Sequence, residues 1–257
     1  MKARKLTVAL VAMLALVAAG CGSSSSGGKP DLVVSAASSL KDAFNQYAQQ
    51  FPEAKVRASF AGSDDLAAQI EQGVKPDLFA SANTKLPDEL FQKGLVQKPV
   101  VFAGNRLVIA VPASGGKVSS LADLAKPGVN IAMGSDSVPV GIYTRKVLAG
   151  LPGDQSAKLL ANVRSNEPDV AGVVGKVAQG AVDAGFVYIT DVDATDGKLK
   201  AIELPASLQP QVAYGIAIVK GAKHPKQAQA FIDGLLHGAG QQALKAAGFD
   251  PPPPAGT

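Results

Sequence analysis

Four short segments of small and hydroxyl-bearing residues lie where a strand is expected to give way to a helix. They are residues 35–40 (Ser-Ala-Ala-Ser-Ser-Leu), 60–66 (Phe-Ala-Gly-Ser-Asp-Asp-Leu), 138–143 (Val-Pro-Val-Gly-Ile-Tyr) and 166–170 (Asn-Glu-Pro-Asp-Val). The first backbone N–H groups of a helix have no partner within it and lie at the positive end of its dipole. Such helix ends bind oxyanions without lysine or arginine. Together, these segments could therefore bind an anion through neutral donors.

Each segment also has a simpler explanation when it is taken alone. Ser, Asp and Asn are among the commonest residues at helix N-caps, where most of them stabilise only their own helix. Oxyanion binding would require the four segments to meet at one place, which spacing along the chain does not show. The residues by themselves leave both interpretations open.

The segments belong to a chain that alternates short apolar runs with helical patterns. Leu40, Phe44, Tyr47 and Phe51 recur at spacings typical of an amphipathic helix. Strands are predicted at residues 32–34, 56–60, 77–80, 107–111, 129–133, 185–188 and 212–219. Further helices are predicted at residues 64–73, 119–125, 141–149, 168–179, 225–236 and 240–246. Alternating strands and helices predict an α/β fold with parallel sheets covered on both faces.

The sequence contains little that indicates an enzyme. The two histidines, His224 and His237, are remote from the four segments, and there is no Gly-x-Ser-x-Gly or His-Glu-x-x-His motif. The alternative of a hydrolase or transferase with Ser39 or Ser63 as its nucleophile would also require a base. We therefore expect a protein that is not an enzyme and that carries no cofactor.

The N-terminus has the organisation of an export signal. Three basic residues within the first five positions precede an apolar run at residues 8–19, and small residues precede Cys21, the only cysteine. Twelve apolar residues are too few to span a membrane, which takes about 20. The ending resembles a bacterial lipobox, in which the cysteine is lipidated. We assign residues 1–20 to a lipoprotein signal peptide and residues 21–30, rich in Gly and Ser, to a flexible tether.

Removal of that signal changes the charge of the chain. The whole sequence has 25 basic and 21 acidic residues, a net charge of +4. Without residues 1–20 it has 22 and 21, which gives +1. Aromatic residues are scarce and no basic stripe is interleaved with them, so we expect no nucleic-acid partner. The remaining 237 residues can form one large or two moderate domains.

The segments, in this order and behind this signal, resemble the molybdate-binding proteins of bacterial ABC importers. The likeness runs from about Leu32 to Phe249, and its most specific pieces are residues 35–40 and 60–63. Further pieces are residues 76–82 (Pro-Asp-Leu-Phe-Ala-Ser-Ala), 138–143 and 185–188 (Gly-Phe-Val-Tyr). The resemblance implies a monomer that captures molybdate, and tungstate with it, and delivers the anion to a membrane permease. Cys21 would carry the lipid anchor to the membrane.

The resemblance also implies a periplasmic-binding-protein fold of type II, with two α/β lobes joined by crossover strands and a ligand cleft between them. Lobe one would comprise residues 31–108 together with residues 215–248, and lobe two residues 109–214. Residues 249–257 would form a disordered, proline-rich tail.

The resemblance further implies which residues hold the anion. They are Ser39, Ser63, Val140, Val170 and Tyr188. The serines would donate from hydroxyl and backbone groups, the valines from backbone N–H groups and the tyrosine from its phenol. The only metal in the site would be the one within the oxyanion.

Neighbouring residues receive other roles. The resemblance leaves Tyr143 and Tyr214 to packing, and Ser38 could exchange roles with Ser39. Related sequences often have serine where this chain has Gly62, a change that we expect only to loosen the turn before Ser63.

Other ligands remain open as alternatives: sulfate, phosphate, ferric iron or a small organic acid. Ferric sites usually use paired tyrosines, and the sequence has no Tyr-Tyr pair. A carboxylate ligand usually calls for an arginine clamp. Arg106, next to the expected crossover, is the first arginine to examine for that role.

Overall fold

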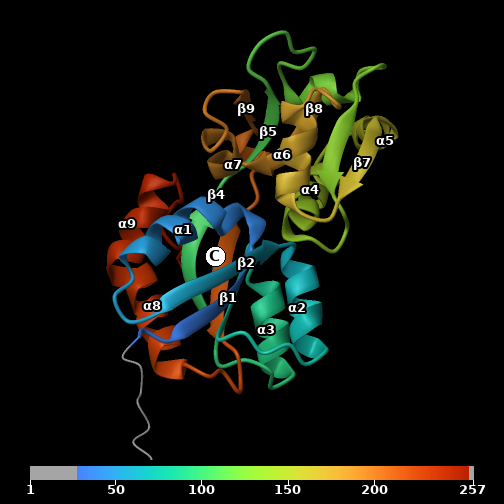
Figure 1. The fold of residues 1–257 in the computed structure, drawn as a ribbon. Helices are drawn as coiled ribbons and strands as arrows, with labels where there is room; N and C mark the ends of the chain where they lie inside the picture. The colour runs from blue at the N-terminus through green and yellow to red at the C-terminus, as the bar shows by residue number, and fades with distance from the viewer. Residues whose placement is uncertain (1–27, 255–257) are drawn as a thin grey trace, which may run out of the picture.

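The computed structural model describes residues 28–254. The predicted signal peptide, Cys21 and most of the predicted tether lie outside the described residues. Within residues 28–254, no helix has both the length and the apolar character needed to cross a membrane. Two lobes, each built on a five-stranded sheet, make up the described chain (Figure 1), which confirms the predicted two-lobed α/β fold.

The first lobe contains both ends of the described chain. Its strands are β1 (Asp31–Ala37), β2 (Lys55–Ala61), β3 (Leu78–Ser81), β4 (Val100–Asn105) and β10 (Val212–Ile218). Its helices are η1 (Ser38–Leu40), α1 (Lys41–Gln50), α2 (Ser63–Glu71), α3 (Lys85–Gln92), α8 (Pro225–His237) and α9 (Ala239–Ala246). The sheet order is β2-β1-β3-β10-β4, in which β1 runs parallel to β2 and β3.

The second lobe is formed by the middle of the chain. Its strands are β5 (Leu107–Pro112), β6 (Ile131–Gly134), β7 (Val163–Glu167), β8 (Ala184–Tyr188) and β9 (Leu199–Glu203). Its helices are η2 (Leu121–Ala125), α4 (Pro139–Ala149), α5 (Gln155–Ala161), α6 (Val170–Ala178), α7 (Ile189–Asp193) and η3 (Ala206–Leu208). The sheet order is β7-β6-β8-β5-β9, in which β6 runs parallel to β7 and β8.

The chain crosses between the lobes twice. Arg106 alone separates β4 from β5, and the return path leads from η3 to β10. The predicted lobe limits, after residue 108 and before residue 215, therefore fall two to three residues inside β5 and β10. Cross-strand pairing decides the assignment: Leu107 pairs with Tyr188 in lobe two, and Val212 pairs with Asn105 in lobe one.

The two sheets are mixed, whereas the sequence predicted parallel sheets. β10 is antiparallel to β3 and β4, and β5 is antiparallel to β8 and β9. The reason is the crossover itself. β8 ends at the boundary between the lobes, whereas β5 begins there, so the two strands pair in opposite directions.

The spacing of apolar residues in the first predicted helix is confirmed by α1. Leu40, Phe44, Tyr47 and Phe51 are all buried, and the last three pack with Phe231 of α8 at ring-centroid distances of 4.5–5.4 Å. Burial, with smaller contributions from Glu53 and Asp233, raises the pKa of Tyr47 to about 12. This aromatic cluster fixes α1, and with it the preceding segment at residues 35–40, against the sheet of lobe one.

The prediction of a disordered tail from residue 249 is wrong for its first two residues. Phe249 is buried, with its ring centroid 5.3 Å from that of Tyr214. Asp250 exchanges backbone hydrogen bonds with Gly104 of β4, at 2.8 and 3.1 Å. Residues 251–254 form no regular secondary structure, and residues 255–257 lie outside the described residues. Pairing with β4, the edge strand of the sheet in lobe one, is what orders the start of this segment.

Candidate anion site between the lobes

The four segments singled out in the sequence all lie where parallel strands end and helices begin. In lobe one, β1 leads into η1 and β2 leads into α2, and the last residues of these strands, Ala37 and Ala61, are paired. In lobe two, β6 leads to α4 and β7 leads to α6, and Gly134 is paired with Glu167. The carboxyl ends of parallel strands meet at one edge of a sheet, which is where ligands bind in open α/β folds.

These helix starts surround one small cavity between the lobes. Its lining includes Ala37, Ser38 and Ser39 from the first segment and Ala61, Gly62 and Ser63 from the second. Lobe two contributes Val138, Pro139, Val140, Asp169, Val170 and Tyr188. The cavity is small, with room at its centre for about one water molecule. All five residues predicted to bind the ligand therefore lie around a single cavity, although their contacts with a ligand stay a prediction.

The two serines of lobe one present hydroxyl groups whose geometry is already constrained. Ser63 is almost fully buried, and its Oγ accepts a hydrogen bond from the backbone N–H of Ala82 at 3.1 Å. That bond leaves the Ser63 proton available to a ligand. Ser39 Oγ lies 3.0 Å from the phenol oxygen of Tyr214. Ser38 lines the cavity beside Ser39. The contact with Tyr214 is made by Ser39, and the possible exchange of roles between the two serines stays a prediction.

The two valines lie in the first turns of their helices. Val140 follows Pro139, which has no N–H, at the start of α4, and Val170 is the first residue of α6. Both side chains are buried and apolar, so the groups that these residues can offer to a ligand are their backbone N–H groups. Asp169 caps α6, where its Oδ1 accepts from the Gly172 N–H at 2.8 Å. Its carboxylate therefore offsets part of the positive end of that helix.

Gly62 brings the lobes together at the cavity. A Cβ atom at this position would collide with the backbone carbonyl oxygen of Pro168 in lobe two and lie 2.9 Å from Asp64 Oδ1. The expectation that Gly62 only loosens the turn before Ser63 is therefore wrong for this chain. Glycine is required because the two lobes approach each other at its Cα.

Tyr188 supplies the most informative polar group of the site. Its side chain is 1% exposed, yet its phenol oxygen has no hydrogen-bond partner among residues 28–254. Burial raises the pKa of this phenol well above its ordinary value, so the group remains a donor. Leaving a buried donor unpaired costs about 1–3 kcal/mol. A ligand oxygen in the cavity would remove that cost.

Asp191 lies directly behind Tyr188, at the start of α7. Its Oδ2 accepts a hydrogen bond from the Tyr188 backbone N–H at 2.9 Å. Burial raises the pKa of Asp191 to about 7; the Tyr188 hydrogen bond opposes the shift, whereas Asp169 and Asp42 add to it. This titratable group therefore lies next to the cavity without lining it.

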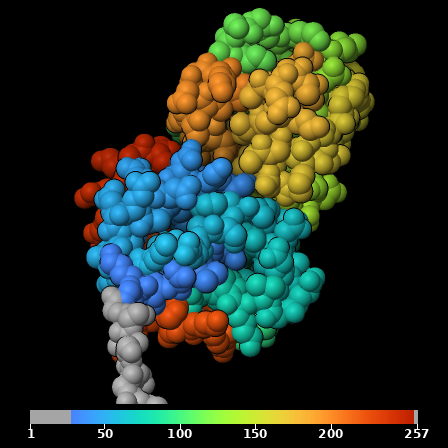
Figure 2. Space-filling view, in the orientation of Figure 1, coloured from blue at the N-terminus to red at the C-terminus, as the bar shows by residue number. Residues whose placement is uncertain are grey.

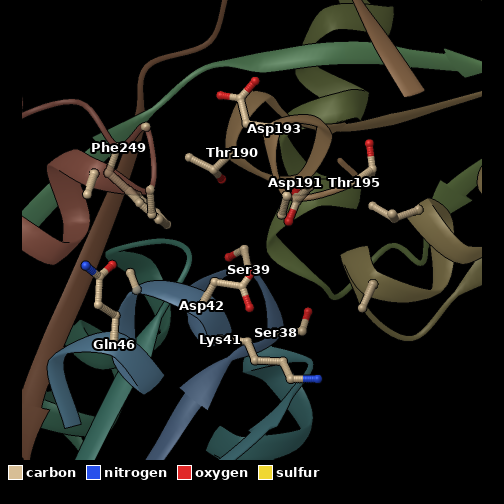
Figure 3. Close-up of a pocket in the computed structure, with 17 residues that line it drawn as sticks. Ser38, Ser39, Lys41, Asp42, Gln46, Thr190, Asp191, Asp193, Thr195 and Phe249 are labelled. Carbon is tan, nitrogen blue, oxygen red and sulfur yellow. The ribbon is translucent and has the colours of Figure 1, made fainter. Parts of the chain in front are cut away.

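A second, larger cavity opens beside Ser39. Its volume is about 710 Å³, and α1, α6, α7 and α9 contribute to its lining. Figure 3 shows Lys41, Asp42 and Gln46 of α1 across this cavity from Thr190, Asp191 and Asp193 of α7. The space-filling view shows the two lobes lying against each other (Figure 2).

The cationic side chains considered from the sequence take no part in the small cavity. Among the described residues, its lining contains no Lys, Arg or His. Arg106 instead lies 2.9 Å from Glu203 and 3.8 Å from Asp250, about half exposed. An arginine clamp for a carboxylate ligand is therefore not formed by Arg106.

The chain is similar to known bacterial solute-binding proteins over almost its whole length. The family model described as bacterial extracellular solute-binding protein matches residues 32–250. The molybdate-binding protein ModA of Mycobacterium tuberculosis is 35% identical over 94% of this chain and 95% of its own. ModA of Haemophilus influenzae is 33% identical over 91% of this chain and 95% of its own.

A solved structure agrees with these matches. The periplasmic molybdate-binding protein of Azotobacter vinelandii has a TM-score of 0.76 and is 25% identical, over 86% of this chain and all of its own. The alignment covers 86% of this chain and so extends over both lobes, which shows that the two-lobed fold is shared as a whole.

Proposed function

The chain belongs to the bacterial extracellular solute-binding protein family, and from that premise we propose that it captures molybdate outside the cytoplasm. We extend the proposal to tungstate, a tetrahedral dianion of the same type, and to delivery of the bound anion to an ABC importer permease. The relatives named as molybdate-binding proteins support the choice of ligand class. The chemistry of the small cavity supports it independently.

One observation carries the proposal: within residues 28–254 the buried phenol of Tyr188 has no hydrogen-bond partner, and Tyr188 lines a cavity formed by helix starts in which those residues place no cation. Removing a dianion from water without compensation would cost tens of kcal/mol. Four helix ends at about +0.5 each approach the ligand's charge, less what Asp169 offsets. Each hydrogen bond to a charged group contributes about 1.5–3 kcal/mol. Several such donors together would support binding.

The donor set also favours some oxyanions over others. Hydroxyl, phenol and backbone N–H groups donate to a fully ionised anion, whereas hydrogen phosphate needs an acceptor for its own proton. Sulfate is fully ionised like molybdate, so these two anions must be separated by size, molybdate being the larger tetrahedron. Sulfate is accordingly the alternative ligand that most needs to be tested.

Export and anchoring complete the proposal. Signal cleavage before Cys21 would make this cysteine the first residue, and its lipid would keep the protein near the permease. A lipid-anchored capture protein needs no cofactor, and we propose that it acts as a monomer.

The proposal treats the serines as ligands rather than nucleophiles. Ser39 Oγ contacts the phenol of Tyr214, and Ser63 Oγ accepts from the Ala82 N–H. Neither contact supplies the base that a serine nucleophile requires. A hydrolase would release product from activated esters, whereas a binding protein would only be stabilised by its ligand.

A panel of melting temperatures tests the proposal. Molybdate and tungstate should raise the melting temperature of the purified mature chain, because a ligand that binds only the folded state stabilises it. Sulfate should raise it much less, and phosphate least. An equal shift with sulfate, or no shift with any of the four anions, would reject molybdate as the ligand.

A further inference from the structure

A chain of buried hydrogen bonds runs from the crossover strands to the small cavity. Asn105, the last residue of β4, lies with its Nδ2 3.3 Å from the phenol oxygen of Tyr214 on β10. The same phenol oxygen lies 3.0 Å from Ser39 Oγ. All three residues are in lobe one, and Asn105 Nδ2 also donates to Thr190 Oγ1 of lobe two at 2.9 Å.

The first link of this chain has a fixed direction. Asn105 Oδ1 accepts a hydrogen bond from the Arg106 backbone N–H at 2.8 Å, which assigns the other end of the amide as the NH₂ group. An NH₂ group can only donate. Asn105 therefore donates to Thr190 and to Tyr214, and the Tyr214 oxygen is an acceptor in this bond.

The second link follows from the first. Tyr214 Oη accepts from Asn105 and keeps its own proton to donate, and Ser39 Oγ, 3.0 Å away in a contact where either oxygen could be the donor, is an acceptor within its reach. Tyr214 is fully buried, so its proton has no access to bulk water as an alternative. With Tyr214 as donor, one Ser39 lone pair is used, and the Ser39 proton is left for another partner, for which the small cavity is one of the two cavities that Ser39 lines.

We propose that Tyr214 is a positioning residue that holds the Ser39 hydroxyl as a donor toward the ligand and so selects against protonated oxyanions. The inference rests on the proposed function and deepens it. Sequence reasoning left Tyr214 to packing, and its ring does pack against Phe102 and Phe249. The added role belongs to its hydroxyl alone.

The chemistry explains the selectivity. A serine hydroxyl that is free to rotate can present either its proton or a lone pair to a ligand, so it serves ionised and protonated oxygens alike. A serine held by a donor behind it presents its proton. Such a serine stabilises an oxygen of molybdate and has one acceptor position fewer for the O–H of phosphate.

A double-mutant cycle tests whether Tyr214 acts through Ser39. Calorimetry would measure molybdate binding by the unmodified chain, Tyr214→Phe, Ser39→Ala and the double variant. We expect Tyr214→Phe to weaken binding about tenfold in the unmodified background and less than twofold when Ser39 is already alanine. An equal loss in both backgrounds would overturn the proposal, because a residue that only supports the fold does not depend on Ser39.

Selectivity provides the second readout. Phosphate binding at pH 6, measured by displacement of molybdate, should weaken less in Tyr214→Phe than molybdate binding does. The dissociation constant of phosphate divided by that of molybdate should therefore fall severalfold. Tyr143→Phe is the matched control, since it also removes a buried phenol hydroxyl, one that accepts from the Ala213 N–H at 3.4 Å. An unchanged ratio in Tyr214→Phe, or the same fall in Tyr143→Phe, would overturn the proposal.

Two further measures keep the outcomes distinct. Asn105→Ala removes the donor that sets the direction and should lower the same ratio even if Tyr214→Phe folds poorly. The cycle is run with whichever of molybdate, tungstate and sulfate the unmodified chain binds. Binding of sulfate alone would contradict the proposed function and still measure the coupling, whereas binding of none would contradict both.

Discussion

The two cavities between the lobes differ in a way that bears on function. The larger one holds about 710 Å³ and is lined by charged side chains, among them Lys41, Asp42 and Asp193. The smaller one has no Lys, Arg or His in its described lining but includes the buried Tyr188, whose phenol has no partner within residues 28–254. Lys41, Asp42 and Asp193 are exposed and therefore solvated, whereas an unpaired buried donor is unstable until a ligand arrives. The volume of a cavity and the formal charge of its lining therefore indicate the binding site less well than an unpaired buried donor does.

The comparison is tested most strongly by removing the phenol of the small cavity. Tyr188→Phe should weaken molybdate binding about 10- to 100-fold, since a hydrogen bond to a charged group contributes about 1.5–3 kcal/mol. In the absence of ligand, the same variant should melt no lower than the unmodified chain, because the lost hydroxyl has no partner in the described part of the chain. Calorimetry and melting curves measure the two effects. A variant that melts several degrees lower and binds normally would show that the phenol is structural.

The second test concerns the close approach of the lobes at the small cavity. Gly62→Ala should weaken molybdate binding about tenfold, because the added Cβ collides with the Pro168 carbonyl oxygen only when the lobes are together. Gly175→Ala is the matched control: it lies within α6, where an added Cβ would lie 4.0 Å from the side-chain amide nitrogen of Gln179 and meet no closer side chain. If both variants bind alike in calorimetry, Gly62 does not govern the approach of the lobes.

The third test uses Asp191, which lines the larger cavity and bonds to the backbone of Tyr188. Its pKa is about 7 in the folded chain, against about 3.9 when unfolded. Between these values the folded state retains a proton that the unfolded state has lost, so stability falls as the pH rises from about 4 to about 7. Asp191→Asn should remove this fall.

Melting temperatures from pH 4 to pH 8 measure that difference. The Asp191→Asn variant should gain stability relative to the unmodified chain as the pH rises toward 7 and gain no more above it. Asp193→Asn, an exposed change on the same helix, serves as the control. A difference that stays constant across the range would contradict the assigned protonation of Asp191.

The smallest effect is expected in the larger cavity. Lys41→Ala removes a cation near Ser39, and if formal charge governed capture of an anion it should weaken binding strongly. Because the side chain is solvent-exposed, we expect a change of less than twofold at physiological salt, where exposed charges are screened. A tenfold loss in calorimetry would move the site toward the larger cavity.

Much of the fold could be predicted because its signals are local. The spacing from Leu40 to Phe51 identifies α1, and apolar runs identify strands such as β5 and β8. β7 was missed because its sequence, Val-Arg-Ser-Asn-Glu, lacks an apolar alternation at the edge of its sheet. The ordered start of the C-terminal segment was missed because it depends on pairing between Asp250 and Gly104, which are far apart in sequence.

The candidate site divides in the same way. The residue types of its helix starts were visible in the sequence, and the resemblance named Ser39, Ser63 and Tyr188. Their meeting at one cavity was not visible, because it depends on how two lobes close. The hydroxyl role of Tyr214 was hidden for a related reason: it lies 175 positions from Ser39, on a strand that returns from the other lobe.

The central claim is that a site of neutral donors binds a tetrahedral dianion and distinguishes it by size. Titration calorimetry of the mature chain with molybdate, in competition with sulfate, tests it most directly. We predict one molybdate per chain, bound much more tightly than sulfate. Molybdate should also raise the melting temperature of the unmodified chain, and Tyr188→Phe should remove most of that rise. Sulfate binding as tight as molybdate, or no heat with either anion, would contradict the account.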